Sequence, residues 1–433
     1  MTNFATINSI KYLVNAFWEM TKSLSDPSWV KSGIFTACAG AFLLTACSEE
    51  VKVGSNGTGM AAPVDDVALE AGLRGLGPTQ IGGVSTDDSS AAISINSQVF
   101  TVASNLRLGM QVNAIGVPAV GAGTTAKLSQ LIAQSTVRGP VQRVDVVQNE
   151  ITVLNRTYRV DANTVLSGLD RLGALTVGNL IEIFASPAAP QSADLATRVV
   201  RVSNTFNAAT DAVEVLGRIT ALSAAGFGLP GLQINSTVFA TAIPVPGVPQ
   251  TTAPAPTVLG ASALVRVVGT LNATGGVDAT RIITAVEPIR KLNAEVQLEG
   301  LTQELTGNPI NRIKVANTAV DVARIDAQIL NQLRLNAKVE ITATQSTTAF
   351  GTGLVATKLR VVPADERIEF ALEGTVSDFV SAANFVVQGE QINAMQASFS
   401  AGSLSDIANG KRVKLRAQAG AGRMDAKTIA VLQ

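Results

Sequence analysis

The sequence contains no histidine, and its only two cysteines, Cys38 and Cys47, lie close to the N-terminus. Without histidine the chain cannot build a Ser-His-Asp triad, a Cys-His pair or a histidine-ligated metal site. Two cysteines near one end also give the body of the chain no disulfide framework, so its stability has to come from packing. We therefore expect a protein that is not an enzyme, with no catalytic residue, no metal site and no cofactor.

Aromatic residues and net charge are also scarce. Aromatic side chains make up 4% of the chain, and 33 basic residues balance 33 acidic ones. A neutral chain does not attract nucleic acid over its whole surface, and binding of single strands needs aromatic stacking platforms. Phe100 and Phe239 lie at strand positions, where we expect them in a core. Nucleic acid is therefore not an expected partner.

The N-terminal segment is typical of a secretory signal. An apolar run at 33–46 follows Lys22 and Lys31 and ends in small residues. The run is shorter than the roughly 20 residues that a membrane-spanning helix needs. We predict a signal peptide at 1–47, and a start at Met20 would give it an ordinary length.

The apolar run ends in a string that resembles the lipobox of bacterial lipoproteins, namely Leu44, Thr45, Ala46 and Cys47. The resemblance implies that Cys47 is diacylated and becomes the mature N-terminus. Several acyl chains together anchor a protein stably in a bilayer. Ser48, in place of an aspartate, resembles the outer-membrane sorting pattern. We expect an outer-membrane lipoprotein of the bacterial envelope that faces either the periplasm or the cell surface.

The remaining chain repeats a pattern of short strands. Each copy opens on an apolar residue and a glycine, at Gly83, Gly139, Gly217, Gly300 and Gly374. Each copy closes on an alanine, polar residues and an aliphatic strand, beginning at Ala126, Ala196, Ala279, Ala356 and Ala426. Five matches in the same order indicate internal duplication.

A unit of about 65 residues with five or six short strands favours a small closed barrel, because closure removes unpaired edges. We predict an all-β chain with a tandem array of about five small OB-like β-barrels, after the signal and a flexible tether. The predicted ranges are 48–78 for the tether and 79–136, 137–205, 212–288, 293–364 and 367–433 for the barrels. The third copy carries an insertion rich in Pro and Thr at 243–258.

Local patterns predict details of these units. Asn96-Ser97 predicts a tight turn between two strands. Strict alternation places Val265 and Val267 inward and Arg266 outward. A weak helical stretch is expected within the tether at 67–73.

The leading glycine, the Asn-turn-aromatic hairpin and the Ala-x-x-Ile closing strand together resemble the bacterial domain-of-unknown-function family 5666. The resemblance covers most of residues 79–433 and implies small barrels in exported or lipid-anchored proteins. Its motifs are short, so it depends on their repetition. The family provides no catalytic residues to transfer to this chain.

Charge patterning yields one candidate binding feature. Arg412, Lys414 and Arg416 share one face of the strand predicted in the last copy. This stripe fits lipid A phosphates, another anionic glycan or nucleic acid, or else it is a solvated outer face. Paired carboxylates such as Asp87-Asp88 do not match a calcium loop.

We therefore expect a non-catalytic binding or structural module of the cell envelope. Its expected partners are the membrane, through the N-terminal lipid, and an envelope protein, peptidoglycan or polysaccharide. The oligomeric state stays open. The alternative is a carboxylate-type envelope glycan hydrolase, or a subunit of an envelope enzyme, which would need two paired Asp or Glu residues.

Overall fold

The computed structural model describes residues 66–100, 103–118, 125–223, 225–236, 240–242, 259–260, 262–285, 292–348 and 351–432. The following predicted features lie outside these residues: the leader 1–47 with Leu44, Thr45, Ala46 and Cys47, the start of the tether at 48–65, Phe239, and the insertion 243–258.

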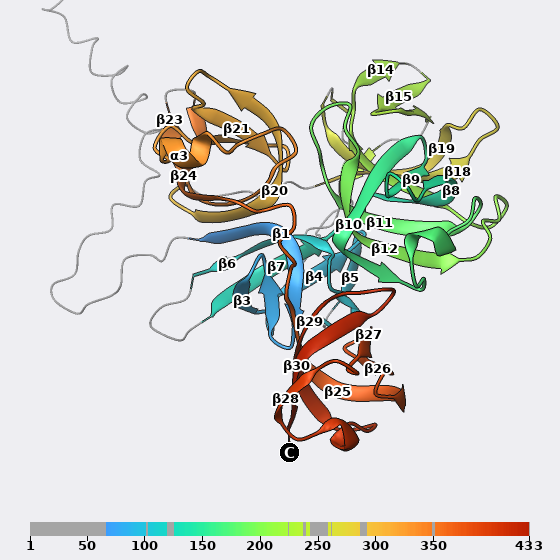
Figure 1. The fold of residues 1–433 in the computed structure, drawn as a ribbon. Helices are drawn as coiled ribbons and strands as arrows, with labels where there is room; N and C mark the ends of the chain where they lie inside the picture. The colour runs from blue at the N-terminus through green and yellow to red at the C-terminus, as the bar shows by residue number, and fades with distance from the viewer. Residues whose placement is uncertain are drawn as a thin grey trace, which may run out of the picture. The chain divides into compact units, whose positions relative to one another are not determined.

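Almost all of the described chain is β-strand, and its strands fall into successive groups along the sequence (Figure 1). Group 1 contains β1 (Val67–Leu76), β2 (Thr79–Ile81), β3 (Val84–Asp87), β4 (Ala92–Ile95), β5 (Gln98–Phe100), β6 (Gln111–Val117) and β7 (Ala126–Ala133). Group 2 contains β8 (Val137–Asp145), β9 (Glu150–Val153), β10 (Arg156–Ser167), β11 (Leu180–Ser186) and β12 (Asp194–Ser203).

Three further groups follow. Group 3 contains β13 (Val213–Arg218), β14 (Ala221–Ser223), β15 (Gly226–Leu229), β16 (Leu232–Asn235), β17 (Ala240–Ala242), β18 (Leu264–Leu271) and β19 (Val277–Thr284). Group 4 contains β20 (Glu295–Thr306), β21 (Arg312–Val315), β22 (Thr318–Asp321), the short helix α3 (Ala327–Leu330), β23 (Lys338–Thr348) and β24 (Gly351–Val361). Group 5 contains β25 (Phe370–Ser381), β26 (Asn384–Val387), β27 (Glu390–Asn393), β28 (Ser398–Ala401), β29 (Arg412–Ala419) and β30 (Met424–Leu432).

Strand pairing closes four of these groups into small barrels. In group 2 the circuit runs β8–β9–β10–β12–β11 and returns to β8. Groups 1, 4 and 5 close in the same manner. Group 3 forms a ladder in the order β13–β18–β19–β16–β15–β14. The prediction of an all-β chain built from small barrels is confirmed.

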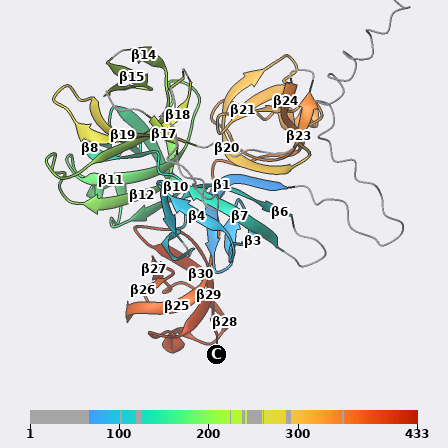
Figure 2. The ribbon, with the colours of Figure 1, turned by 180° about the vertical axis from the view of Figure 1, so that it is seen from behind.

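Strands of different groups also pair with one another, which the repeat pattern did not predict. An 18-stranded sheet joins groups 1, 4 and 5, and a 12-stranded sheet joins groups 2 and 3. Strand β1 makes the first connection, because it pairs with β6 of its own barrel and in parallel with both β20 and β25. Figures 1 and 2 show β1 beside β20 from opposite sides. Strands β8 and β13 make the connection between groups 2 and 3.

The position of β1 shows that two predictions were wrong. The predicted tether 48–78 includes a core strand, and the helical stretch predicted at 67–73 is part of that strand. Both faces of β1 are buried: Leu69 and Leu73 lie in the core of groups 1 and 5, whereas Ala68 lies in the core of group 4. A strand buried on both faces often shows a nearly continuous apolar run without alternation. Strand β1 does alternate, since Leu69, Ala71 and Leu73 face the core of group 1 and Glu70 and Arg74 point away from it. The helical interpretation of 67–73 missed this period of two.

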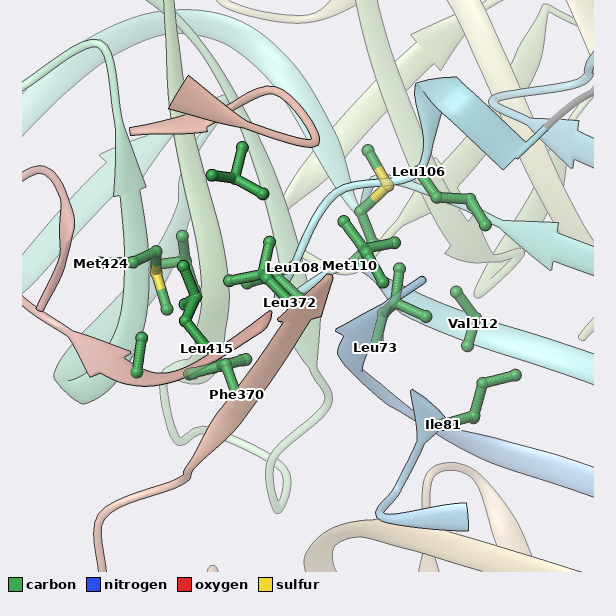
Figure 3. Packing of buried hydrophobic residues seen from close by; sticks show 14 of the residues in the cluster. Leu73, Ile81, Leu106, Leu108, Met110, Val112, Phe370, Leu372, Leu415 and Met424 are labelled. Carbon is green, nitrogen blue, oxygen red and sulfur yellow. The ribbon is translucent and has the colours of Figure 1, made fainter. Parts of the chain in front are cut away.

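The hydrophobic cores cross group boundaries as the sheets do. One cluster contains Leu73 and Leu108 of group 1 together with Phe370 and Leu415 of group 5, and Figure 3 shows these side chains in one packed region. A second cluster covers groups 2 and 3. A single barrel of this size buries only about 60% of its unfolded surface. Shared cores therefore add burial that each barrel alone lacks.

Two local predictions have different outcomes. The Asn96-Ser97 turn is confirmed, since both residues have a positive φ, 48° and 68°, between β4 and β5. Val265 and Val267 are fully buried, as alternation predicts. Arg266 does point away from them, but it is completely buried rather than exposed, because the outer face of β18 lies against other groups.

Candidate functional site

The predicted basic stripe lies on β29, on the solvent side of group 5. The side chains of Arg412, Lys414 and Arg416 are each more than 60% exposed. Glu373 accepts a 2.7 Å contact from Arg412 and lies 3.6 Å from Lys414, and Glu369 pairs with Arg416. Two carboxylates, Glu373 of β25 and Glu369 just before it, thus lie beside the three cations and lower the positive potential of the stripe.

Buried ion pairs occur where the groups meet. Arg198 of β12 and Glu390 of β27 are almost fully buried, and their Nη1 and Oε1 atoms are 2.8 Å apart. The same Glu390 oxygen accepts a hydrogen bond from the backbone N–H of Leu108, and Arg198 donates to the carbonyl of Leu108. Next to this pair, Gly389 has a φ of 77° and a side chain there would collide with the guanidinium of Arg107. One ion pair therefore joins groups 1, 2 and 5.

Arg266 forms a second junction, which connects group 3 to group 1 and to the segment that links β7 to β8. Its guanidinium donates to Glu214 at 2.9 Å, to the Asn96 side-chain oxygen at 3.1 Å and to the Ser135 carbonyl at 2.8 Å. Burial lowers the pKa of Arg266, and Glu214 opposes this shift by stabilising the charged form. The turn at Asn96 thus has a second role, because it brings an amide to a buried cation.

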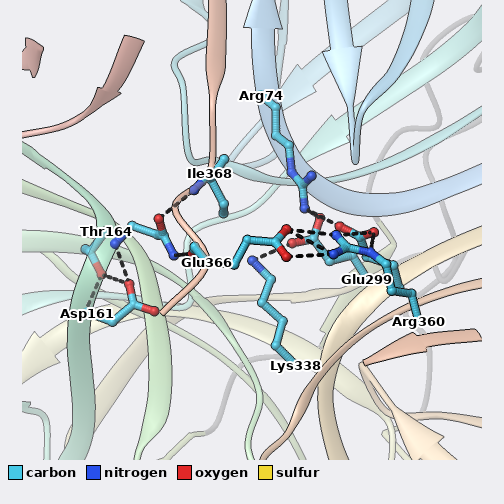
Figure 4. Close-up of polar contacts among 10 residues, drawn as sticks. Arg74, Asp161, Thr164, Glu299, Lys338, Arg360, Glu366 and Ile368 are labelled. Atoms are coloured by element: carbon cyan, nitrogen blue, oxygen red, sulfur yellow. Dashed lines mark hydrogen bonds and ion pairs between the residues drawn. The ribbon is translucent and has the colours of Figure 1, made fainter. Parts of the chain in front are cut away.

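A third network, drawn in Figure 4, joins β1 to group 4. Glu299 of β20 pairs with Arg74 of β1 and with Lys338 of β23, each at 2.8 Å. Burial alone would raise the pKa of Glu299, but the charges of Lys338 and Arg74 outweigh this effect and lower it. Glu340 lies between Arg74 and Arg360 and extends the network toward solvent. Glu299 therefore stays ionised at neutral pH.

A cleft with a volume of about 230 Å³ opens beside Glu299. Four groups line it, and most of the side chains are amides, hydroxyls or carboxylates. The polar lining residues are Glu70, Gln111, Asn113, Gln134, Thr136, Ser186, Arg218, Glu299, Asn317 and Thr318. A cavity of about 30 Å³ beside Arg74 and Asn163 also has polar lining residues from several groups, but the larger volume of this cleft leaves room for a ligand. We therefore take it as the candidate site and call it the central cleft.

None of the cleft residues was predicted from the sequence as a site residue. One signal was present: a Leu-Glu pair stands near the start of β1, β20 and β25, at Leu69-Glu70, Leu298-Glu299 and Leu372-Glu373. An alignment of copies on this Leu-Glu pair would have moved the start of the first repeat from Gly83 back to β1. The other residues of the cleft come from different strands, so their proximity has no local signature.

Within the described part of the chain, no three Asp, Glu, His or Cys side chains are grouped so that they could hold a metal ion. No helix among the described residues has the length and apolar character to cross a bilayer.

The fold and the cleft define a nearly all-β protein of small barrels that share strands and buried ion pairs. Comparison with known families adds one match: the model of the Domain of unknown function (DUF5666) matches residues 138–200, which run from β8 into β12. Over this range the predicted resemblance is confirmed. No curated protein and no solved structure matches the chain.

Proposed function

We propose that this chain is a lipid-anchored protein of the bacterial outer membrane, and that five tandem barrels of the DUF5666 type form a non-catalytic binding or structural module. The observation that carries the proposal is the pairing of β1 with β20 and β25. Hydrogen-bonded strands fix the spacing between barrels, so the module presents its outer faces as one array. Weak contacts on such an array add up through avidity.

The lipid anchor rests on the lipobox-like string that ends in Cys47. Strand β1 begins at Val67, so a short segment separates the acylated cysteine from the first barrel. This arrangement would keep the array close to the membrane, where peptidoglycan, polysaccharide and envelope proteins are its candidate partners.

Anchoring is tested by metabolic labelling of cells with a radioactive fatty acid, followed by fractionation. We expect label on the wild-type chain in the outer-membrane fraction and no label on Cys47→Ala. Cys38→Ala, which keeps the proposed acylation site, serves as the control. An unlabelled wild-type chain would refute lipidation. Protease treatment of intact cells, with a blot for group 5, then separates a surface orientation from a periplasmic one.

The binding version is tested by capture of partners from envelope extracts and from purified peptidoglycan with the full-length chain. Retention of a specific component supports it. A chain that retains nothing would favour a spacer, in which the array only holds the envelope layers apart.

The alternative, a glycan hydrolase with two carboxylates, has less support from the central cleft. Glu70 and Glu299 both line it, but a general acid needs a raised pKa and that of Glu299 is lowered. Hydrolysis of peptidoglycan that disappears with Glu299→Gln would revive this alternative.

A further inference from the structure

The central cleft has a wall of unpartnered amides that group 1 provides. In β6 the side chains of Val112 and Ala114 point into the barrel core, so Gln111 and Asn113 point outward by alternation. Glu70 is the direct partner of Asn113 on β1, which places both side chains on the same outer face. Strand alternation thus lines up polar groups along the cleft.

The amides of Gln111, Asn113 and Gln134 are half-buried. Within the part of the chain that the structure describes, these three side chains have no hydrogen-bond partner. An amide offers two N–H donors and a carbonyl acceptor, and partly buried polar groups gain when a ligand satisfies them. Three such groups along one cleft offer a ligand several donors and acceptors.

The opposite wall, from group 4, is held in place before any ligand binds. Asn317 has a φ of 65° in the turn before β22. Gln303 fixes this turn, because its Oε1 accepts a 2.6 Å hydrogen bond from the Asn317 N–H and its Nε2 donates to the Asn317 Oδ1 at 3.1 Å. Gln303 also donates to the carbonyl of Ala188 in group 2. A pre-organised wall reduces the entropic cost of binding.

The charges of the cleft disfavour ionic ligands. The carboxylates of Glu70 and Glu299 repel an anion, while Arg218 opposes a cation. Arg74 and Lys338 already neutralise Glu299. The lining thus carries charges of both signs, which disfavours a ligand with a net charge, and it presents neutral donors and acceptors between them.

Apolar side chains complete the lining. Pro187, Leu216 and Leu264 border the cleft next to these polar groups. A ring that carries hydroxyls around its rim and C–H groups on its faces matches this combination. The volume of about 230 Å³ is below the range of drug-sized ligand pockets, roughly 300–1,000 Å³, and suits one sugar ring.

We propose that the central cleft binds a neutral saccharide, of the size of one sugar unit, through the amides of Gln111, Asn113 and Gln134. The described residues that line the cleft include no aromatic side chain, so the saccharide is held there by hydrogen bonds and C–H contacts, with weak affinity. This inference rests on the proposed binding role and names the ligand class for one site of the array.

Saturation-transfer NMR on the full-length chain tests the proposal, in micelles of a detergent that has no sugar headgroup. The probes are D-glucose and N-acetyl-D-glucosamine, with D-glucuronate and inorganic phosphate as charged counterparts. We expect transfer to at least one neutral sugar. The variants Asn113→Ala and Gln134→Ala should each weaken its affinity by about 2- to 12-fold, as for loss of one hydrogen bond.

Gln391→Ala is the matched control, because it removes an exposed amide on β27 that lies outside the cleft. Circular dichroism verifies that each variant is folded. No transfer to either neutral sugar, equal affinity in the Asn113/Gln134 double variant, or tighter binding of glucuronate or phosphate would each overturn the proposal. The assay uses purified protein, so these outcomes leave the tests of anchoring and of envelope partners unaffected.

Discussion

At the scale of single residues, buried cations at the junctions matter more for stability than exposed ones. We expect Arg266→Ala to lower the free energy of unfolding by about 3–5 kcal/mol, because it removes a fully buried cation together with its ion pair to Glu214 and its hydrogen bonds to Asn96 and Ser135. Arg143→Ala is the control, since that side chain is 68% exposed and its pair with Asp145 contributes about 1 kcal/mol or less. Urea unfolding followed by circular dichroism measures both. Equal losses in the two variants would contradict the proposed junction.

The ion pairs of Glu299 lead to a further prediction at the residue scale, about how the free energy of unfolding depends on pH. Because the folded pKa of Glu299 lies below its ordinary value of 4.5, its ion pairs contribute fully above that value. The contribution is lost as the pH falls from about 4.5 through the lowered folded pKa. We expect Glu299→Gln to reduce the loss of stability between pH 5 and pH 3, about the window of this titration.

Glu304→Gln, on an exposed position of the same strand, is the control for this pH effect. Urea midpoints at several pH values, for the wild type and both variants, provide the comparison. A pH profile of Glu299→Gln that is parallel to the wild type would show that other carboxylates account for the acid sensitivity.

At the scale of elements, β1 differs most from what its sequence pattern predicted, and hydrogen exchange tests its place. The amides of Ala68, Leu69 and Glu70 lie in a strand that pairs with β6 on one side and with β20 on the other. We expect them to exchange only through global unfolding, and thus among the slowest in the chain. The exposed edge strand β14 should exchange much earlier. Complete exchange of β1 at the first time point would restore the tether interpretation.

The charged face of β29 gives a second element-scale prediction. Since Glu369 and Glu373 lie beside its three cations, we expect little binding of the wild type to vesicles that contain phosphatidylglycerol. Glu369→Gln with Glu373→Gln should increase binding at low salt, and replacement of Arg412, Lys414 and Arg416 by Ser should remove that increase. Strong binding of the wild type that the Ser variant loses would support the anionic-ligand stripe.

Comparison of the elements shows which features can be predicted from short stretches of sequence and which depend on packing between groups. Alternation and tight turns are local, so the strands around Val265 and the turn at Asn96 could be predicted from short windows. The cleft could not, because Asn113, Ser186 and Asn317 meet only after separate groups have packed together. The same applies to Arg266: alternation gave its direction, but its complete burial depends on the neighbouring groups.

At the scale of the whole molecule, the ion pair of Arg198 with Glu390 should couple the unfolding of the groups. Replacing Arg198 by Ala removes the ion-pair partner of the buried Glu390 carboxylate, which keeps the hydrogen bond from the Leu108 N–H and the charge of the nearby Arg107. Removal of one partner of a buried ion pair costs about 3–5 kcal/mol. The substitution therefore weakens the contact of group 5 with groups 1 and 2, whereas the strand pairing of β1 with β25 remains. We expect scanning calorimetry of Arg198→Ala to show an additional early transition.

Arg416→Ala is the control for this coupling, because it removes an exposed ion pair within group 5 and leaves the junction intact. It should shift the melting profile only slightly and add no transition. If Arg198→Ala keeps the wild-type number of transitions and only shifts them all downward, the groups behave as one cooperative unit through β1 and their shared cores. If it leaves the profile unchanged, the buried pair does not hold group 5, and the fixed array on which the proposed function depends would lose that support.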